Sequence, residues 1–203
     1  MLRRLFAAMY DRVGRASEDA GMRDERRRLL ASAEGVAIEI GAGTGLNLAH
    51  YPAAVTRLVL AEPDRHMRAR LARRVAELHP AAEVVDAPAE RLPFPAATFD
   101  TAVVTLVLCS VPDQAAALDE IARVLKPDGR LLFLEHVRSD DPKVASLQDR
   151  IRPVTSCCVG CNPNRATLVA IEASALTVES VQHGEIPKAP TFERPMIVGS
   201  ARR

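Results

Sequence analysis

The chain has 203 residues, enough for one domain with a hydrophobic core of its own. Its 27 lysine and arginine residues nearly balance 26 aspartate and glutamate residues, so the formal net charge is +1. This balance gives no reason to expect a nucleic-acid or anionic-membrane partner. No apolar run reaches the length of a membrane span, and the N-terminal segment lacks the character of a signal peptide. We therefore expect a soluble, cytoplasmic protein.

Residues 1–34 are predicted to form two helices, the first with Leu5, Met9 and Val13 at fourfold spacing. Beyond them, short apolar runs alternate with helical patterns. Strands are expected at residues 36–40, 57–61, 83–85, 101–107, 130–136, 176–181 and 196–200, and helices at 64–78, 113–126 and 167–173. This alternation predicts an α/β fold with a mostly parallel sheet.

Within the helices, Asp113 is a plausible N-cap, and Leu118, Ile121 and Leu125 are expected to face inward. Residues 138–164 are polar, interrupted by proline and rich in cysteine. An irregular stretch of this length inside a compact domain is typical of a lid or a binding loop.

The strongest motif is the turn at residues 39–45, which follows a strand and is expected to open a helix. Gly41, Gly43 and Gly45 give the spacing G-x-G-x-G, whereas the dinucleotide fingerprint G-x-G-x-x-G would need glycine where Leu46 stands. Glu39 adds negative charge beside the turn, which suits a ligand that carries an ammonium and a sulfonium group. The spacing therefore favours S-adenosylmethionine over a nicotinamide or flavin dinucleotide, with a tight turn that binds no ligand as the alternative.

Together with residues 60–64, 90–94, 99–100 and 123–129, this turn resembles the class I S-adenosylmethionine-dependent methyltransferases, in the methyltransferase type 11 and quinone-methylating group. The resemblance implies a single Rossmann-like domain at residues 35–203. Its seven-stranded, mostly parallel sheet would have an antiparallel last strand and helices on both faces. Residues 1–34 would cap the site, and residues 138–164 would form a lid-like insert.

The same resemblance implies which residues hold S-adenosylmethionine and release S-adenosylhomocysteine. The three glycines would line the methionine and ribose, Glu39 would lie near the amino group, and Glu62, at the end of the second expected strand, would accept hydrogen bonds from the ribose hydroxyls. The remaining cofactor contacts would come from Pro63, Asp64, Ala89, Glu90, Thr105 and Leu106.

The sequence departs from the family at Pro88, where an aspartate often accepts a hydrogen bond from the adenine amino group. Proline has no side-chain acceptor. Backbone groups of Ala89, or the carboxylates of Asp86 or Glu90, would have to replace that contact.

A narrower resemblance concerns residues 47–52, 105–111, 135–137 and 161–165, which are similar to the subgroup that includes animal alkyl-thiol methyltransferases. It implies methylation of a small thiol, without the N-terminal membrane helix of the animal members. Transfer to oxygen, nitrogen or carbon of a metabolite is the alternative. A protein that binds the cofactor without catalysis is an alternative of another class.

Three side chains are candidates for the chemistry. His136 ends a strand at the edge where ligands bind in open α/β sheets, Tyr10 lies on the expected capping helix, and Arg165 follows the cysteine-rich stretch. Each also has a purely structural interpretation, as a hydrogen-bonding, core or ion-paired residue. A thiolate acceptor needs little help from a base, whereas a hydroxyl or a carbon acid needs a positioned one.

Four cysteines stand at positions 109, 157, 158 and 161. Cys158 and Cys161 have zinc-ligand spacing, but a second pair is missing. Cys109 or a histidine completes a site only if the fold brings it near. We expect unliganded thiols and no metal.

Overall fold

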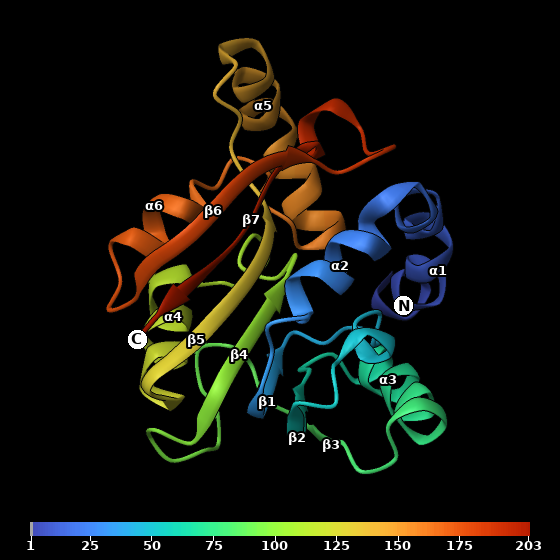
Figure 1. Cartoon of the computed structure of the whole chain (residues 1–203). Helices are drawn as coiled ribbons and strands as arrows, with labels where there is room; N and C mark the ends of the chain where they lie inside the picture. Colours follow the sequence, from blue (N-terminus) through green and yellow to red (C-terminus); the bar gives the residue numbers. More distant parts are fainter. Residues whose placement is uncertain (1) are drawn as a thin grey trace.

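The computed structural model describes residues 2–203, with the side chains of residues 2–6, 8, 158 and 159 left out. Its centre is one sheet with the strand order β3-β2-β1-β4-β5-β7-β6 (Figure 1). The strands are β1 (Gly35–Ile40), β2 (Val55–Ala61), β3 (Glu83–Val85), β4 (Phe99–Thr105), β5 (Leu125–His136), β6 (Thr177–Glu185) and β7 (Pro195–Arg202). Only β7 pairs antiparallel with its two neighbours, so the expected seven-stranded sheet with an antiparallel last strand is confirmed.

Helices cover both faces of the sheet. In Figure 1, α4 and α6 lie on one side, and α2 and α3 lie on the other. The helices are α1 (Leu2–Ser17), α2 (Arg23–Leu30), α3 (Arg65–Leu78), α4 (Gln114–Val124), α5 (Pro142–Val159) and α6 (Thr167–Glu172), and the segment Glu18–Met22, kinked at Gly21, joins α1 to α2. No helix in the described part of the chain is long and apolar enough to cross a membrane.

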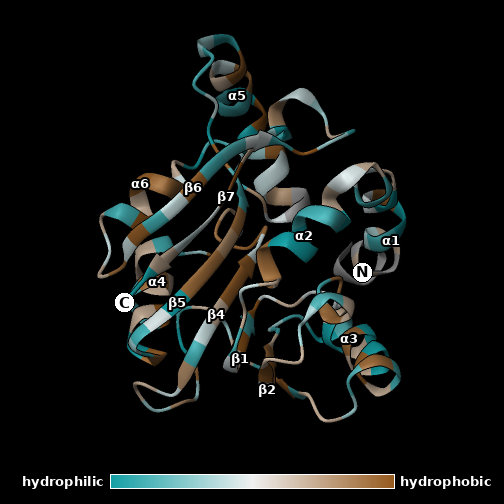
Figure 2. Ribbon diagram, viewed as in Figure 1, coloured by the Kyte–Doolittle hydropathy of each residue, from teal (hydrophilic) through white to brown (hydrophobic). Residues whose placement is uncertain are grey.

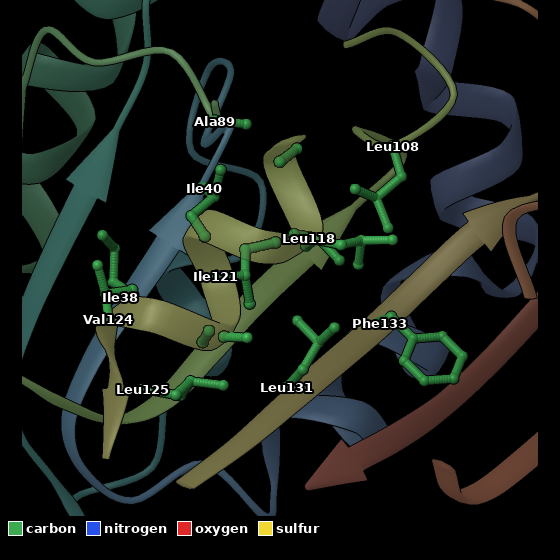
Figure 3. Close-up of a cluster of buried hydrophobic side chains, with 14 of the residues drawn as sticks. Ile38, Ile40, Ala89, Leu108, Leu118, Ile121, Val124, Leu125, Leu131 and Phe133 are labelled. Carbon is green, nitrogen blue, oxygen red and sulfur yellow. The ribbon is translucent and has the colours of Figure 1, made fainter. Parts of the chain in front are cut away.

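The core follows the alternation of side chains along the strands. Ile38 and Ile40 of β1 join the cluster on the α4 side, whereas Ala37 joins the cluster on the α3 side. Figure 3 shows the first cluster, in which Leu118 and Ile121 of α4 lie over the sheet. The expected inward positions of Leu118 and Ile121 are confirmed, because both side chains are fully buried. Leu125, expected on the same helix, instead begins β5, because α4 ends at Val124. In Figure 2, brown marks hydrophobic residues along β4 and β5, the central strands of this core.

Two aspartates begin helices at the edge of the sheet where the site lies. Asp64 accepts hydrogen bonds from the backbone N–H groups of His66 and Met67 at the start of α3. Asp113, the expected N-cap, accepts from Ala116 N–H at the start of α4. Such caps each contribute about 1 kcal/mol, and they fix the positions of the loops that precede the helices.

The structure corrects the expected helix after the glycine turn. Only a short 3₁₀ turn, Leu48–His50, follows it before β2 begins at Val55. Pro52 stands in the short connection between the two, and proline cannot continue a helix. A helix dipole therefore contributes nothing at this turn.

The cysteine-rich stretch is more regular than its composition indicates, because residues 142–159 form the helix α5. Asp141 accepts from Lys143 N–H to begin it, Pro142 stands in its first turn, and Gly160 ends it in the left-handed region at φ 75°. Proline at a helix start and glycine after its end are the usual signals for these boundaries. The strand expected at 101–107 likewise ends early, at Thr105, because Leu106 has φ 59°.

Candidate active site

A cavity opens at the carboxyl ends of β1 and β4. It lies at the point where the chain order of the strands reverses, since β2 and β3 lie on one side of this pair and β5 on the other. Ligands of open α/β sheets bind at such a switch point. The lining residues are Tyr10, Arg26, Glu39, Gly41, Ala42, Gly43, Thr44, Leu46 and Thr105.

The glycines of the turn have different structural roles. Gly43 has φ 57°, and a Cβ added there would meet nothing nearer than the Gly41 carbonyl oxygen at 3.9 Å. The space beside Gly43 is therefore open to a ligand. A Cβ on Gly45 would lie 2.7 Å from Leu48 Cδ1 and 2.9 Å from Leu71 Cδ1, so this glycine lets the turn pack against α3.

Glu39 is buried at the end of β1. Its carboxylate accepts hydrogen bonds from Asn47 Nδ2 at 2.9 Å and from the Tyr51 hydroxyl at 2.8 Å. Burial outweighs these two bonds and raises the pKa of Glu39 to about 7. A cationic group placed beside it would restore the charged form.

Arg26 is the opposite charge in the lining, and the sequence analysis did not single it out. It extends from α2, is 3% exposed, and donates from Nη1 to Asn47 Oδ1 at 3.0 Å and to Thr105 Oγ1 at 3.1 Å. Its Nε donates to Glu18 Oε1 at 3.1 Å. Its spacing in the helix could have predicted this burial, because Arg26 shares one face of the helix with the buried Met22, Leu29 and Leu30. The cavity thus has a cation and an acid in its wall.

Glu62 directly follows β2 and is 6% exposed. Its Oε2 accepts from Gly43 N–H and its Oε1 from Asp64 N–H, both at 2.8 Å. Burial is the main reason that the pKa of Glu62 is raised. The carboxylate therefore holds the glycine turn against the end of β2, and it keeps lone pairs for further donors.

The other residues expected near the adenine lie on the loops beside Glu62. Pro63 is exposed and Ala89 is buried. Glu90 Oε1 accepts from Asp113 N–H at 3.3 Å, and Asp86 forms an ion pair with Arg68 at 2.6 Å. Both acids that were considered as replacements for the missing aspartate already have partners.

The N-terminal helices close the cavity from one side. Tyr10 of α1 is in the lining, and burial raises the pKa of its hydroxyl. The Thr44 hydroxyl donates to Asp11 Oδ1 at 2.5 Å, and Asp11 also pairs with Arg74 of α3 at 3.0 Å. These bonds tie α1 to both the glycine turn and α3. Met9 and Val13 of the expected apolar stripe are exposed instead of buried.

Thr105, at the end of β4, lines the cavity, and the next residue, Leu106, donates from its N–H to the Leu134 carbonyl. Beyond them, Glu135 Oε1 accepts from the N–H groups of Val107 at 2.9 Å and Leu108 at 3.1 Å. The buried Glu135 therefore shapes the loop after β4, and burial raises its pKa to about 7.

His136 and Arg165 are outside the described lining of the cavity. Arg165 donates to the carbonyl oxygens of Leu108 at 2.6 Å and Pro112 at 3.5 Å, so it braces the loop after β4. His136 is 4% exposed, and its Nε2 lies 2.7 Å from Cys161 Sγ. The fold also brings Cys109 close to His136 and Cys161. The sequence analysis named this approach as the requirement for a metal site.

Comparisons with known proteins show the family. A model of the methyltransferase domain family matches residues 38–133. Thiol S-methyltransferase TMT1A of Homo sapiens is 31% identical over 179 residues, which cover 81% of this chain and 69% of the relative. A phosphatidylethanolamine N-methyltransferase of Cereibacter sphaeroides is 33% identical over 149 residues, 70% of each chain.

A crystal structure of an S-adenosylmethionine-dependent methyltransferase from Thermotoga maritima, described as a possible histamine N-methyltransferase, has the same fold. The TM-score is 0.74 at 20% identity, and the match covers 99% of this chain and 97% of that one. The family match includes the glycine turn and Thr105, which line the cavity, and also Glu62. The chain belongs to the class I S-adenosylmethionine-dependent methyltransferases that act on small molecules.

Proposed function

We propose that this enzyme transfers the methyl group of S-adenosylmethionine to the sulfur of a small thiol. The observation that carries the choice of acceptor is the composition of the cavity wall. Its titratable side chains, among the described lining residues, are Tyr10, Arg26 and Glu39. Arg26 is a cation, Tyr10 has a raised pKa, and Glu39 is held by two donors. The pKa of Glu39 is near neutral, but its two donors and the cofactor ammonium proposed to lie beside it occupy the carboxylate, so no described lining residue is left to act as a base.

Without such a base, the acceptor must ionise readily by itself. A thiol with a pKa near 8.5 is already a few per cent thiolate at neutral pH, whereas a phenol or an alkyl ammonium gives far less of its reactive form. The similarity to a thiol S-methyltransferase over 81% of the chain supports the same acceptor.

The charges of the wall fit the amino-acid end of the cofactor. We propose that Arg26 binds its carboxylate and that Glu39 attracts its ammonium group, with Gly41 and Gly43 beside the chain between them. Thr105 and Leu106 border this end on β4. Glu62 would accept from the ribose hydroxyls, and Gly45 would support the turn from behind.

Adenine would lie between Pro63, Asp64 and the loop at Ala89 and Glu90. Because the Asp86 and Glu90 carboxylates have partners, the adenine amino group would be bound by backbone groups at Ala89.

In the transfer, a lone pair of the thiolate sulfur forms a bond to the methyl carbon while the bond from that carbon to the sulfonium breaks. The products are a thioether and neutral S-adenosylhomocysteine. The enzyme contributes alignment and exclusion of water. Tyr10 would border the transferred methyl from α1, and Arg165 would act as a positioning residue through the loop after β4.

The test is a competition assay in which small alkyl thiols, amines, phenols and quinols share one reaction with S-adenosylmethionine. Thiols should dominate the products. N-methylation is the second candidate, because the N-methyltransferase from Cereibacter sphaeroides is 33% identical over 70% of the chain. Faster turnover of amines, phenols or quinols than of every thiol would refute the thiol assignment and leave the methyltransferase assignment intact.

A further inference from the structure

Three metal-ligating side chains meet beside the loop after β4. They are Cys109 on that loop, His136 at the end of β5, and Cys161 just after α5. One ligand atom from each lies within 4.8 Å of the other two. Cys109 and His136 are buried, at 2% and 4% exposure, and Cys161 is half-buried.

Hydrogen bonds independent of the sulfur atoms hold the two thiol-bearing segments together. Asn162 donates to the Cys109 carbonyl oxygen from its backbone N–H at 3.0 Å and from Nδ2 at 3.2 Å. Arg165 donates to the neighbouring Leu108 carbonyl. The two loops that carry the thiols are therefore fixed against each other, so the cluster is a preformed arrangement instead of a chance approach of mobile side chains.

The histidine ring is oriented by this cluster. Its Nε2 faces Cys161 Sγ at 2.7 Å, and its Nδ1 is buried without a hydrogen-bond partner among the described residues. A cation at Nε2 would supply a strong interaction at the one nitrogen that faces other ligands.

We propose that Cys109, His136 and Cys161 bind one zinc ion. Two thiolates and one imidazole are a ligand set that suits Zn²⁺, and binding would release the two thiol protons to solvent. In a tetrahedral site a nitrogen and a sulfur ligand lie about 3.6 Å apart, given bonds of about 2.0–2.1 and 2.3 Å. The pair at 2.7 Å must therefore open by about 0.9 Å, a change that needs movement of the half-buried Cys161 side chain and not of its loop.

The proposal replaces the sequence-based expectation of unliganded thiols, and it does not depend on the nature of the methyl acceptor. The zinc would join the loop after β4, the end of β5 and the segment after α5. The cluster also lies near the cavity, because Cys109 stands on the loop that begins after Thr105, a residue of the cavity lining. Loss of the ion would loosen this side of the site.

The test begins with the full-length protein, purified without chelators or a metal-affinity step and kept reduced. Elemental analysis after dialysis against limiting zinc should give about one equivalent. Replacement by Co²⁺ should give intense sulfur-to-cobalt charge-transfer absorption and the visible bands of a tetrahedral site. A reduced protein that binds neither ion stoichiometrically, or that binds Co²⁺ without thiolate absorption, would overturn the proposal.

Cysteine variants locate the ion. Cys161→Ser and Cys109→Ser should each lose most of the zinc and of the charge-transfer band. Cys157→Ser is the matched control, because Cys157 is exposed on the last turn of α5 and outside the cluster; it should keep about one equivalent. Circular dichroism checks that each variant is folded, and the cobalt spectrum of the unmodified protein remains decisive if Cys109→Ser does not fold. Equal zinc content in all three variants would refute the assigned ligands.

Discussion

Glu62 offers the sharpest test of the proposed cofactor site, because its two structural bonds and its proposed ligand bonds make separable contributions. In Glu62→Ala, the N–H groups of Gly43 and Asp64 lose acceptors at 2.8 Å. A buried donor left unsatisfied costs about 1–3 kcal/mol, so the melting temperature should fall measurably. Hydrogen bonds from the ribose to a charged carboxylate contribute about 1.5–3 kcal/mol, which corresponds to a loss of roughly tenfold to a hundredfold in affinity.

Isothermal titration calorimetry with S-adenosylhomocysteine, at a temperature where the variant is folded, measures the second effect, and thermal unfolding without ligand measures the first. Glu83→Ala is the control, because Glu83 is an exposed acid on the neighbouring β3 and pairs with Arg57. It should change neither value appreciably. A folded Glu62→Ala protein with an unchanged dissociation constant would remove Glu62 from the cofactor site.

Four further predictions concern the cavity wall and the helix α1 beside it. Gly43→Val should abolish measurable cofactor binding, because the side chain would enter the open space beside the turn at a φ of 57° that valine disfavours; normal binding in calorimetry would contradict the assignment of the turn. Cofactor affinity should rise about tenfold between about pH 6 and pH 8 relative to Glu39→Gln, because the pKa of Glu39 is about 7 without ligand and an adjacent ammonium lowers it; equal pH profiles would place the ammonium elsewhere. The same raised pKa means that folding stability falls as the pH rises from about 4.5 to 7, and Glu39→Gln should remove part of that slope in denaturant titrations. Asp11→Asn should speed cofactor release in stopped-flow measurements, because it weakens the links of α1 to Thr44 and Arg74; an unchanged rate would show that α1 does not retain the cofactor.

The sheet was predictable because its strands are apolar runs bounded by turn residues, and the strand at 83–85 has the same bounds in the structure. The family motifs were equally visible, and some of them serve the fold. Asp100, for example, accepts hydrogen bonds from Val36 N–H and Lys126 Nζ and so joins the start of β1 to the start of β5. The predicted end of a strand was wrong where a single backbone angle decides it, as at Leu106 after β4.

The parts of the site that the sequence analysis missed depend on tertiary contacts. Arg26 stands in a run of charges that normally faces solvent, and only packing of α2 against the sheet turns it toward Thr105. Cys109, His136 and Cys161 are far apart in sequence and meet because β4 and β5 are neighbours and α5 returns the chain to their ends. Ligand-spacing rules examine local pairs, so they found Cys158 and Cys161 and could not find this cluster.

The most direct test of the central claim is mass spectrometry of the products formed from trideuteromethyl-labelled S-adenosylmethionine and a small alkyl thiol. The account predicts a thioether that carries the labelled methyl group on sulfur, together with an equal amount of S-adenosylhomocysteine. Saturation of the enzyme with cofactor while every tested thiol remains unlabelled, and an amine or quinol in the same mixture becomes labelled, would contradict it.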